Sequence, residues 1–270
     1  MKLGIGSWTF PWSVGLQNKL ELKKRIGLDE ILDLAVDMDV GLIQICDNLP
    51  LCSLDDKMLQ RFKENAQQHK VDIEVGTRGV LPENLLNYLD IAMKLDSGYV
   101  RTIVDTPDTE DGLELAIKHL KQVVPLYEKQ NVKIGLENHE RHRVKHLAYI
   151  IEKVDSPNLG ICLDTINSIG VLESVREVAE VLAPYVNCLH FKDVSVIRLN
   201  SNMGFTIQGS VPGEGFLDID AIMDILTHYD RSFNVILEQW PPFSGDIYET
   251  IEREKKWAYE GIEYLKGKLF

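Results

Sequence analysis

Short apolar runs alternate with longer amphipathic segments along the whole chain. Eight runs have the length and composition of buried strands, and they span residues 3–8, 42–48, 72–78, 99–105, 133–137, 159–164, 186–190 and 234–238. Six segments between them carry apolar residues at helical spacing, namely residues 28–38, 82–95, 111–130, 171–182, 218–229 and 247–266.

Strands that alternate with helices pair in parallel through right-handed crossovers. Eight such units predict an α/β fold, a single (β/α)8 TIM barrel, and 270 residues is an ordinary length for one. An open doubly wound sheet is the alternative, but no G-x-G-x-x-G follows the first strand. No linker or low-complexity tract interrupts the chain, so we predict one domain over residues 1–270.

One segment departs from this alternation. Residues 194–215 are too long for an ordinary connection, and long loops in compact domains are commonly lids or binding loops. We therefore expect this segment to close over the site, with Phe205 or Glu214 near a bound substrate.

Composition narrows the classes of partner. The formal net charge is −13, whereas nucleic acid and anionic membranes attract basic surfaces, so neither is expected as a partner. No apolar run approaches the roughly 18 residues of a membrane span, and the N-terminus reads as a strand rather than a signal peptide. The four cysteines lack C-x-x-C spacing and fit reduced thiols, which predicts a cytoplasmic location. A monomer and a homo-oligomer both remain open.

The last four predicted strands each end in a residue type that binds metals: Glu137, Asp164, His190 and Glu238. Barrel enzymes carry their active sites at the carboxyl ends of the strands, and adjacent strands lie about 4.8 Å apart. The residue before each of the four is a leucine, so the four share one phase of the strand alternation and are expected to point into the barrel. Three carboxylates and one imidazole suit one divalent ion, with Mn²⁺, Mg²⁺ or Co²⁺ favoured and Zn²⁺ possible. A salt-bridge network at the barrel rim is the alternative interpretation.

The segments around these residues carry a family resemblance. Leu136-Glu-Asn138, Leu163-Asp-Thr165, Leu189-His-Phe-Lys-Asp193, Pro212-Gly-Glu-Gly215 and Leu237-Glu238 resemble the xylose-isomerase-like sugar isomerase and epimerase superfamily over essentially the whole chain. The resemblance implies that Glu137 and Glu238 are both ligands and catalytic acid/base groups. It also implies isomerisation or epimerisation of a small carbohydrate, with a metal-bound enediolate stabilised by the ion.

Three positions depart from the epimerase pattern. Asn167 stands where that pattern has a histidine, Arg143 where it has a glutamate, and Val196 where it has an arginine. The segments at residues 44–50 and 74–79 resemble instead a subgroup associated with 3-oxo-isoapionate decarboxylation, which implies a lyase acting on a sugar-derived β-keto acid as the alternative. An endonuclease-IV-like DNA repair enzyme is a remote alternative, since it needs further histidines.

Several side chains are candidates for binding the substrate. Arg78, Lys192 and Arg143 are basic positions near the expected metal, and an arginine is well suited to hold a carboxylate. The alternative is structural pairing, of Arg78 with Asp105 and of Lys192 with Asp193 or Glu214. The other candidates are His139, Asn167, Trp8 and Trp240, the two tryptophans as walls of the pocket. Lower in the barrel, a buried Glu74–Arg101 ion pair is expected, because buried charges persist only when paired.

Overall fold

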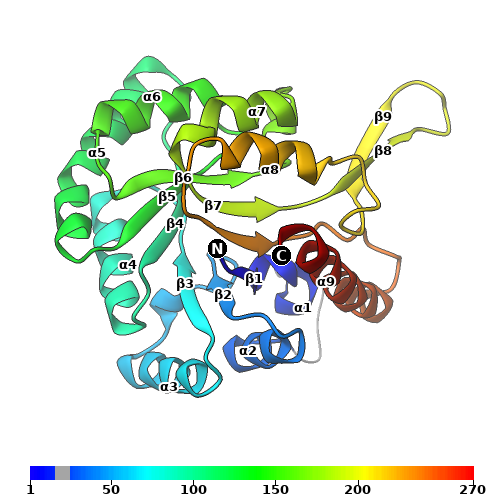
Figure 1. Ribbon diagram of the computed structural model, residues 1–270, viewed down its shortest axis with the longest axis horizontal. Helices are drawn as coiled ribbons and strands as arrows, with labels where there is room; N and C mark the ends of the chain where they lie inside the picture. The colour runs from blue at the N-terminus through cyan, green and yellow to red at the C-terminus, as the bar shows by residue number, and fades with distance from the viewer. Residues whose placement is uncertain (16–24) are drawn as a thin grey trace.

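The eight predicted strands close into a barrel. The computed structural model describes residues 1–15 and 25–270, and the barrel order is β1-β10-β7-β6-β5-β4-β3-β2 with every neighbouring pair parallel (Figure 1). The strands are β1 Leu3–Gly6, β2 Leu42–Ile45, β3 Asp72–Gly76, β4 Tyr99–Ile103, β5 Lys133–Glu137, β6 Leu159–Asp164, β7 Val186–Phe191 and β10 Asn234–Leu237. The TIM-barrel prediction is confirmed.

Helices surround this barrel on the outside (Figure 1). They are α1 Pro11–Val14, α2 Leu28–Asp37, α3 Asp56–Gln68, α4 Pro82–Lys94, α5 Glu110–Lys129, α6 Val144–Val154, α7 Val175–Leu182, α8 Ile219–Thr227 and α9 Ile247–Leu269. Side-chain caps begin several of them, as Asp55 does for α3 and Asp246 for α9. The sequence reasoning missed α3 and α6. Within the described ranges, no helix is both long and apolar enough to cross a membrane.

The alternation along the strands sorts side chains between two apolar regions. The leucines that precede the four predicted ligands pack in the main core between barrel and helices, at positions 136, 163, 189 and 237. Cys162, Cys188 and Ile236 form a separate cluster inside the barrel. A Cβ on Gly135 would lie 1.8 Å from the Tyr99 hydroxyl oxygen, so only glycine fits there. The predicted inward phase of the strand ends is therefore observed.

The segment predicted as a lid is instead a β-hairpin. Strands β8 Val194–Arg198 and β9 Phe205–Gly209 pair antiparallel and extend away from the barrel (Figure 1). Phe205 is 61% exposed and Glu214 is also exposed. The expectation that this segment closes over the metal face is not met, because the hairpin extends away from the barrel (Figure 1).

Asp193 ties the base of this hairpin. Its buried carboxylate accepts hydrogen bonds from four backbone N–H groups, those of Val194, Gly213, Gly215 and Leu217, at 2.8–3.1 Å. A Cβ on Gly215 would lie 2.0 Å from the Asp193 carboxylate. The glycine at this position of the Gly-Glu-Gly motif therefore lets the returning chain approach Asp193 closely.

Candidate metal and substrate site

The four predicted ligands meet at the carboxyl ends of β5, β6, β7 and β10. All four side chains are buried. One ligand atom each from Glu137, Asp164 and His190 lie within 4.8 Å of one another. The Oε1 atom of Glu238 lies 3.1 Å from Nδ1 of His190. The structure therefore brings together three carboxylates and one imidazole around one point.

His190 has the hydrogen bonding of a metal ligand. Its Nε2 atom lies 2.8 Å from Gln44 Oε1, a carbonyl oxygen that only accepts, so Nε2 carries a proton. Its Nδ1 atom is buried without a hydrogen-bond partner, although Glu137 Oε2 lies 3.3 Å away and Glu238 Oε1 closer still. A cation between these three groups would satisfy all of them, so the residues fit a divalent ion.

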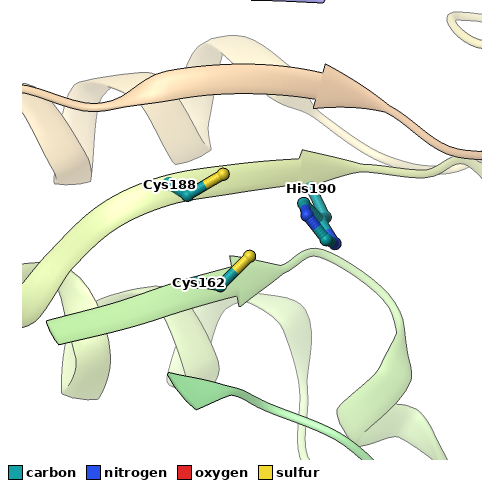
Figure 2. Close-up of side chains that lie close together, drawn as sticks. All are labelled: Cys162, Cys188 and His190. Carbon is teal, nitrogen blue, oxygen red and sulfur yellow. The ribbon is translucent and has the colours of Figure 1, made fainter. Parts of the chain in front are cut away.

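Two thiols lie below this cluster. Cys162 and Cys188 stand on neighbouring strands one inward position before Asp164 and His190, and Figure 2 shows both sulfur atoms on the side that carries His190. Burial raises the pKa of both thiols, so they remain protonated. The two thiols form an apolar floor beneath the site. The carboxylates above them are therefore the better ligands for a hard divalent ion.

Both oxygens of Glu137 are engaged by fixed donors. Arg101 Nε contacts Oε2, and Asn167 Nδ2 donates to Oε1 at 2.8 Å. Burial would raise the pKa of Glu137, but Arg101 and then His190 outweigh it and hold that pKa well below its usual range. Glu137 is therefore a fixed carboxylate anion.

The predicted Glu74–Arg101 ion pair is wrong. In the strand register Arg101 lies beside Gly76, one inward position above Glu74. Arg101 therefore reaches up to Glu137 and to Asp47, whose Oδ1 lies 3.1 Å from Arg101 Nη1. Glu74 accepts hydrogen bonds from neutral Gln44 and Asn234 instead.

Lys192 points into the cluster. Its Nζ atom lies 2.5 Å from Asp164 Oδ2 and 2.8 Å from Glu238 Oε2, and 5.1 Å from the centre of the Trp240 ring. The alternative pairing of Lys192 with Asp193 or Glu214 is not observed, because Asp193 is occupied by backbone N–H groups. Lys192 thus belongs to the site.

A pocket of about 250 Å³ opens above these groups. Its lining includes most of the predicted substrate-binding side chains, and it consists of Trp8, Arg78, Arg101, Glu137, His139, Glu140, Asn167, Lys192, Glu238 and Trp240. Arg78 Nε lies 3.2 Å from Asp47 Oδ2, so its pairing is with Asp47 rather than Asp105. No residue of the β8–β9 hairpin lines this pocket.

Arg143 does not join the site. It immediately precedes α6 and its side chain is half exposed, with Nη1 3.9 Å from Glu173 Oε1. The expectation that it reaches in from this loop is therefore not met. Three further residues join the site: Asp47, Arg101 and Gln44. The strand alternation predicted that Gln44 and Arg101 point into the barrel, whereas no sequence signal predicted Asp47.

Comparisons with known proteins agree with this picture. A family model described as "Xylose isomerase-like TIM barrel" matches residues 32–268. The chain is 31% identical over 265 residues to 3-oxo-isoapionate decarboxylase of Pectobacterium atrosepticum, covering 98% of this chain and 95% of the relative.

Solved structures share the fold. D-psicose 3-epimerase from Clostridium cellulolyticum H10, solved with D-tagatose, superposes with a TM-score of 0.74 at 17% identity, covering 98% of this chain and 97% of that one. A xylose isomerase-like TIM barrel protein from Mycobacterium smegmatis in complex with magnesium superposes with a TM-score of 0.71 at 15% identity, covering 97% of each chain. At these identities the likeness is one of fold.

Proposed function

The chain belongs to the xylose isomerase-like TIM barrel family, and from that premise we propose that it is a divalent-metal-dependent decarboxylase of a sugar-derived β-keto acid. The relative of similar length that is 31% identical carries that type of activity in its name. The expected isomerase or epimerase is the second candidate.

The proposed metal ligands are Glu137, Asp164, His190 and Glu238. Their buried atoms converge, and the unpartnered Nδ1 of His190 lies among the carboxylates. A bound Mg²⁺, Mn²⁺ or Co²⁺ would supply Lewis-acid stabilisation of negative charge on the substrate's keto oxygen. Lys192 forms ion pairs with Asp164 and Glu238 and offsets part of their negative charge.

The hydrogen bonds that Glu137 accepts from Arg101 and Asn167 favour decarboxylation over epimerisation. Epimerisation through two carboxylates requires each to take up and release the proton of the substrate. Glu137 has both oxygens occupied by Arg101 and Asn167 and a pKa held well below its usual range. It suits a ligand better than a base, whereas decarboxylation needs no base to remove a proton from carbon.

The basic side chains of the pocket are suited to an anionic substrate. Arg78, Arg101 and Lys192 line it together with the carboxylates of Glu137, Glu140 and Glu238, and Asp47 and Asp164 pair with these cations. A bound divalent ion would offset the excess of two carboxylates. Arg78 is the most exposed of the three cations and so the one placed to hold a carboxylate.

In the proposed reaction, the bond between the carboxylate carbon and the carbon next to the keto group breaks. Its electron pair forms a double bond to the keto carbon while the π pair of the keto group moves to the keto oxygen, and CO₂ leaves. The enolate carbon left behind then takes a proton as the keto group re-forms. The Nζ atom of Lys192 lies 2.8 Å from Glu238 Oε2 beside the pocket, and we assign the ammonium group of Lys192 the supply of that proton. Trp8 and Trp240 wall the pocket, and His139 is positioned to bond a substrate hydroxyl.

The epimerase candidate rests on the approach of Glu137 and Glu238 to the same imidazole nitrogen, 3.3 and 3.1 Å away. That arrangement brings two carboxylates close to one point, and proton exchange on two faces of a substrate carbon would need two such groups. The endonuclease-like alternative lacks support, because the described residues add no second histidine to the acidic cluster.

One experiment separates the two candidates. Mn²⁺-loaded protein is incubated in D₂O with 3-oxo-isoapionate and, separately, with neutral ketohexoses. Release of CO₂ from the keto acid supports the proposal, whereas solvent deuterium in an isomerised ketohexose without CO₂ release replaces it with epimerisation. Asp164→Asn protein serves as the control for background decarboxylation.

A further inference from the structure

A chain of buried polar side chains crosses the barrel beneath the site. It runs from Asn234 through Glu74 and Gln44 to His190, a proposed ligand. Gln44 stands on β2 and reaches His190 on β7 across the barrel interior, beside inward Gly6 of β1, which has no side chain; β1 and β10 lie between the two strands. Gln44, Glu74 and His190 are all buried. The site is thereby connected to the opposite end of the barrel.

The direction of each bond in this chain is fixed. The backbone N–H of Lys2 donates to Asn234 Oδ1 at 2.9 Å, so the Asn234 amide must turn its NH₂ group toward Glu74. Glu74 accepts that bond on Oε1 at 2.8 Å and a second, from Gln44 Nε2, on Oε2 at 3.0 Å. The Gln44 carbonyl oxygen therefore faces His190, and it only accepts.

We propose that Gln44 and Glu74 are positioning residues that keep the proton of His190 on Nε2 and thereby reserve Nδ1 for the ion. This inference rests on the proposed metal function. A ligating histidine commonly donates its other N–H to such a partner, which fixes the tautomer and the ring orientation. Here the second partner, Glu74, lies at the N-terminal end of the barrel interior, remote from the substrate pocket.

Replacing Glu74 by glutamine reverses the chain without removing a side chain. Asn234 still donates, so the new amide turns its oxygen to Asn234 and its NH₂ group to Gln44. Gln44 must then present its own NH₂ group to His190, which favours the tautomer with the proton on Nδ1. Glu74→Gln is thus a remote, nearly isosteric change with a specific expected consequence at the ligand.

The first readout is nuclear magnetic resonance of metal-free protein with ¹⁵N-labelled histidine. The wild-type protein is expected to show a slowly exchanging Nε2–H resonance for His190, assigned by its loss in His190→Asn. Glu74→Gln and Gln44→Met should each lose it. Persistence of the resonance in both variants would overturn the inference, whatever the protein's reaction proves to be.

The second readout is Mn²⁺ affinity, measured from free Mn²⁺ by electron paramagnetic resonance. Glu74→Gln and Gln44→Met should each weaken binding by about 10- to 100-fold. Tyr99→Phe is the matched control, because it removes the hydroxyl that bonds Asn187 in the same end of the barrel without touching Gln44. Equal affinity in wild type, both variants and control would overturn the inference. Absence of Mn²⁺ binding in the wild type would instead contradict the proposed metal function and leave the resonance to decide the role of Gln44.

Discussion

Arg101 and Glu137 form a buried ion pair between neighbouring strands, with Arg101 Nε directed at Glu137 Oε2. The guanidinium stabilises the ionised form of a proposed metal ligand and simultaneously binds Asp47 and the carbonyl oxygen of Thr77. The pair therefore links the electrostatics of the ligand set to the first loops of the barrel.

Replacing Arg101 by methionine should raise the pKa of Glu137. An ionised Glu137 is needed to hold a cation, so the acid limb of Mn²⁺ binding is expected to move to higher pH. Breaking a buried pair should also lower the free energy of unfolding by about 3–5 kcal/mol. Both are measured by Mn²⁺ titration at several pH values and by urea unfolding. Arg61→Met, which removes an exposed pair with Asp29, should change neither, and an unmoved acid limb in Arg101→Met would contradict the assignment.

His190→Ala should abolish Mn²⁺ binding and catalysis together, since the imidazole nitrogen lies among the carboxylates. Bound metal is counted by elemental analysis after dialysis against Mn²⁺. His139→Ala provides the control, because His139 lines the pocket but pairs with Glu140 outside the ligand cluster. Stoichiometric metal retained by His190→Ala counts against the proposed ligand set.

Arg78→Ala is expected to raise KM for a carboxylated substrate by about 30-fold or more, which corresponds to the lower end of the about 2–5 kcal/mol typical of a lost charged contact. The effect on a matched neutral sugar should be small. The comparison is kcat/KM for both substrates in each protein. Arg143→Ala, which removes an arginine outside the pocket, should behave as wild type. An equal loss for both substrates in Arg78→Ala would argue against carboxylate recognition.

Asp193→Asn should loosen the base of the hairpin. The new amide nitrogen would face N–H donors that the carboxylate now accepts, including Gly213 and Gly215. Unsatisfied buried donors cost about 1–3 kcal/mol each. Hydrogen exchange at these two glycines should accelerate, while Glu214→Gln, an exposed change in the same turn, should leave it unchanged. Unaltered exchange in Asp193→Asn would contradict the role given to this carboxylate.

Glu254 predicts a pH-dependent stability. This buried carboxyl on α9 accepts hydrogen bonds from Ser13 and from the backbone N–H of Trp12, and burial raises its pKa from 4.5 to about 7. The folded protein therefore favours the protonated form, and its stabilising effect fades as pH rises through 7. The free energy of unfolding of the wild type relative to Glu254→Gln should fall between pH 5 and pH 8. A difference that is constant or rises would show that the carboxyl is ionised throughout.

Sequence periodicity sufficed for the barrel and for the four proposed ligands. Each ligand ends a strand, and the preceding leucine fixes its phase, so the direction of the side chain follows from local pattern alone. The hairpin had a comparable signal in the alternation of Val194–Arg198 and Phe205–Gly209 around a turn at Gly204. That signal was outweighed by the length of the segment.

Contacts across the barrel were not predictable in the same way. The partners of Arg101 depend on strand register, which sets it one inward position above Glu74 and level with Gly135. The reach of Gln44 to His190 depends on Gly6, its neighbour on β1, having no side chain. Such contacts join residues far apart in the sequence, and the local sequence pattern does not predict which of them form.

The carboxylate of Asp193 closes the hairpin at its base, independently of the strands that project beyond it. The barrel therefore has a hairpin whose base is held together by hydrogen bonds outside its two strands. Residues between the two strands can be shortened, lengthened or replaced by a peptide tag or a reporter domain with the barrel's own ends of chain undisturbed. For engineering, this turn is the natural place to attach the protein to a surface, with the substrate entrance left facing the solution.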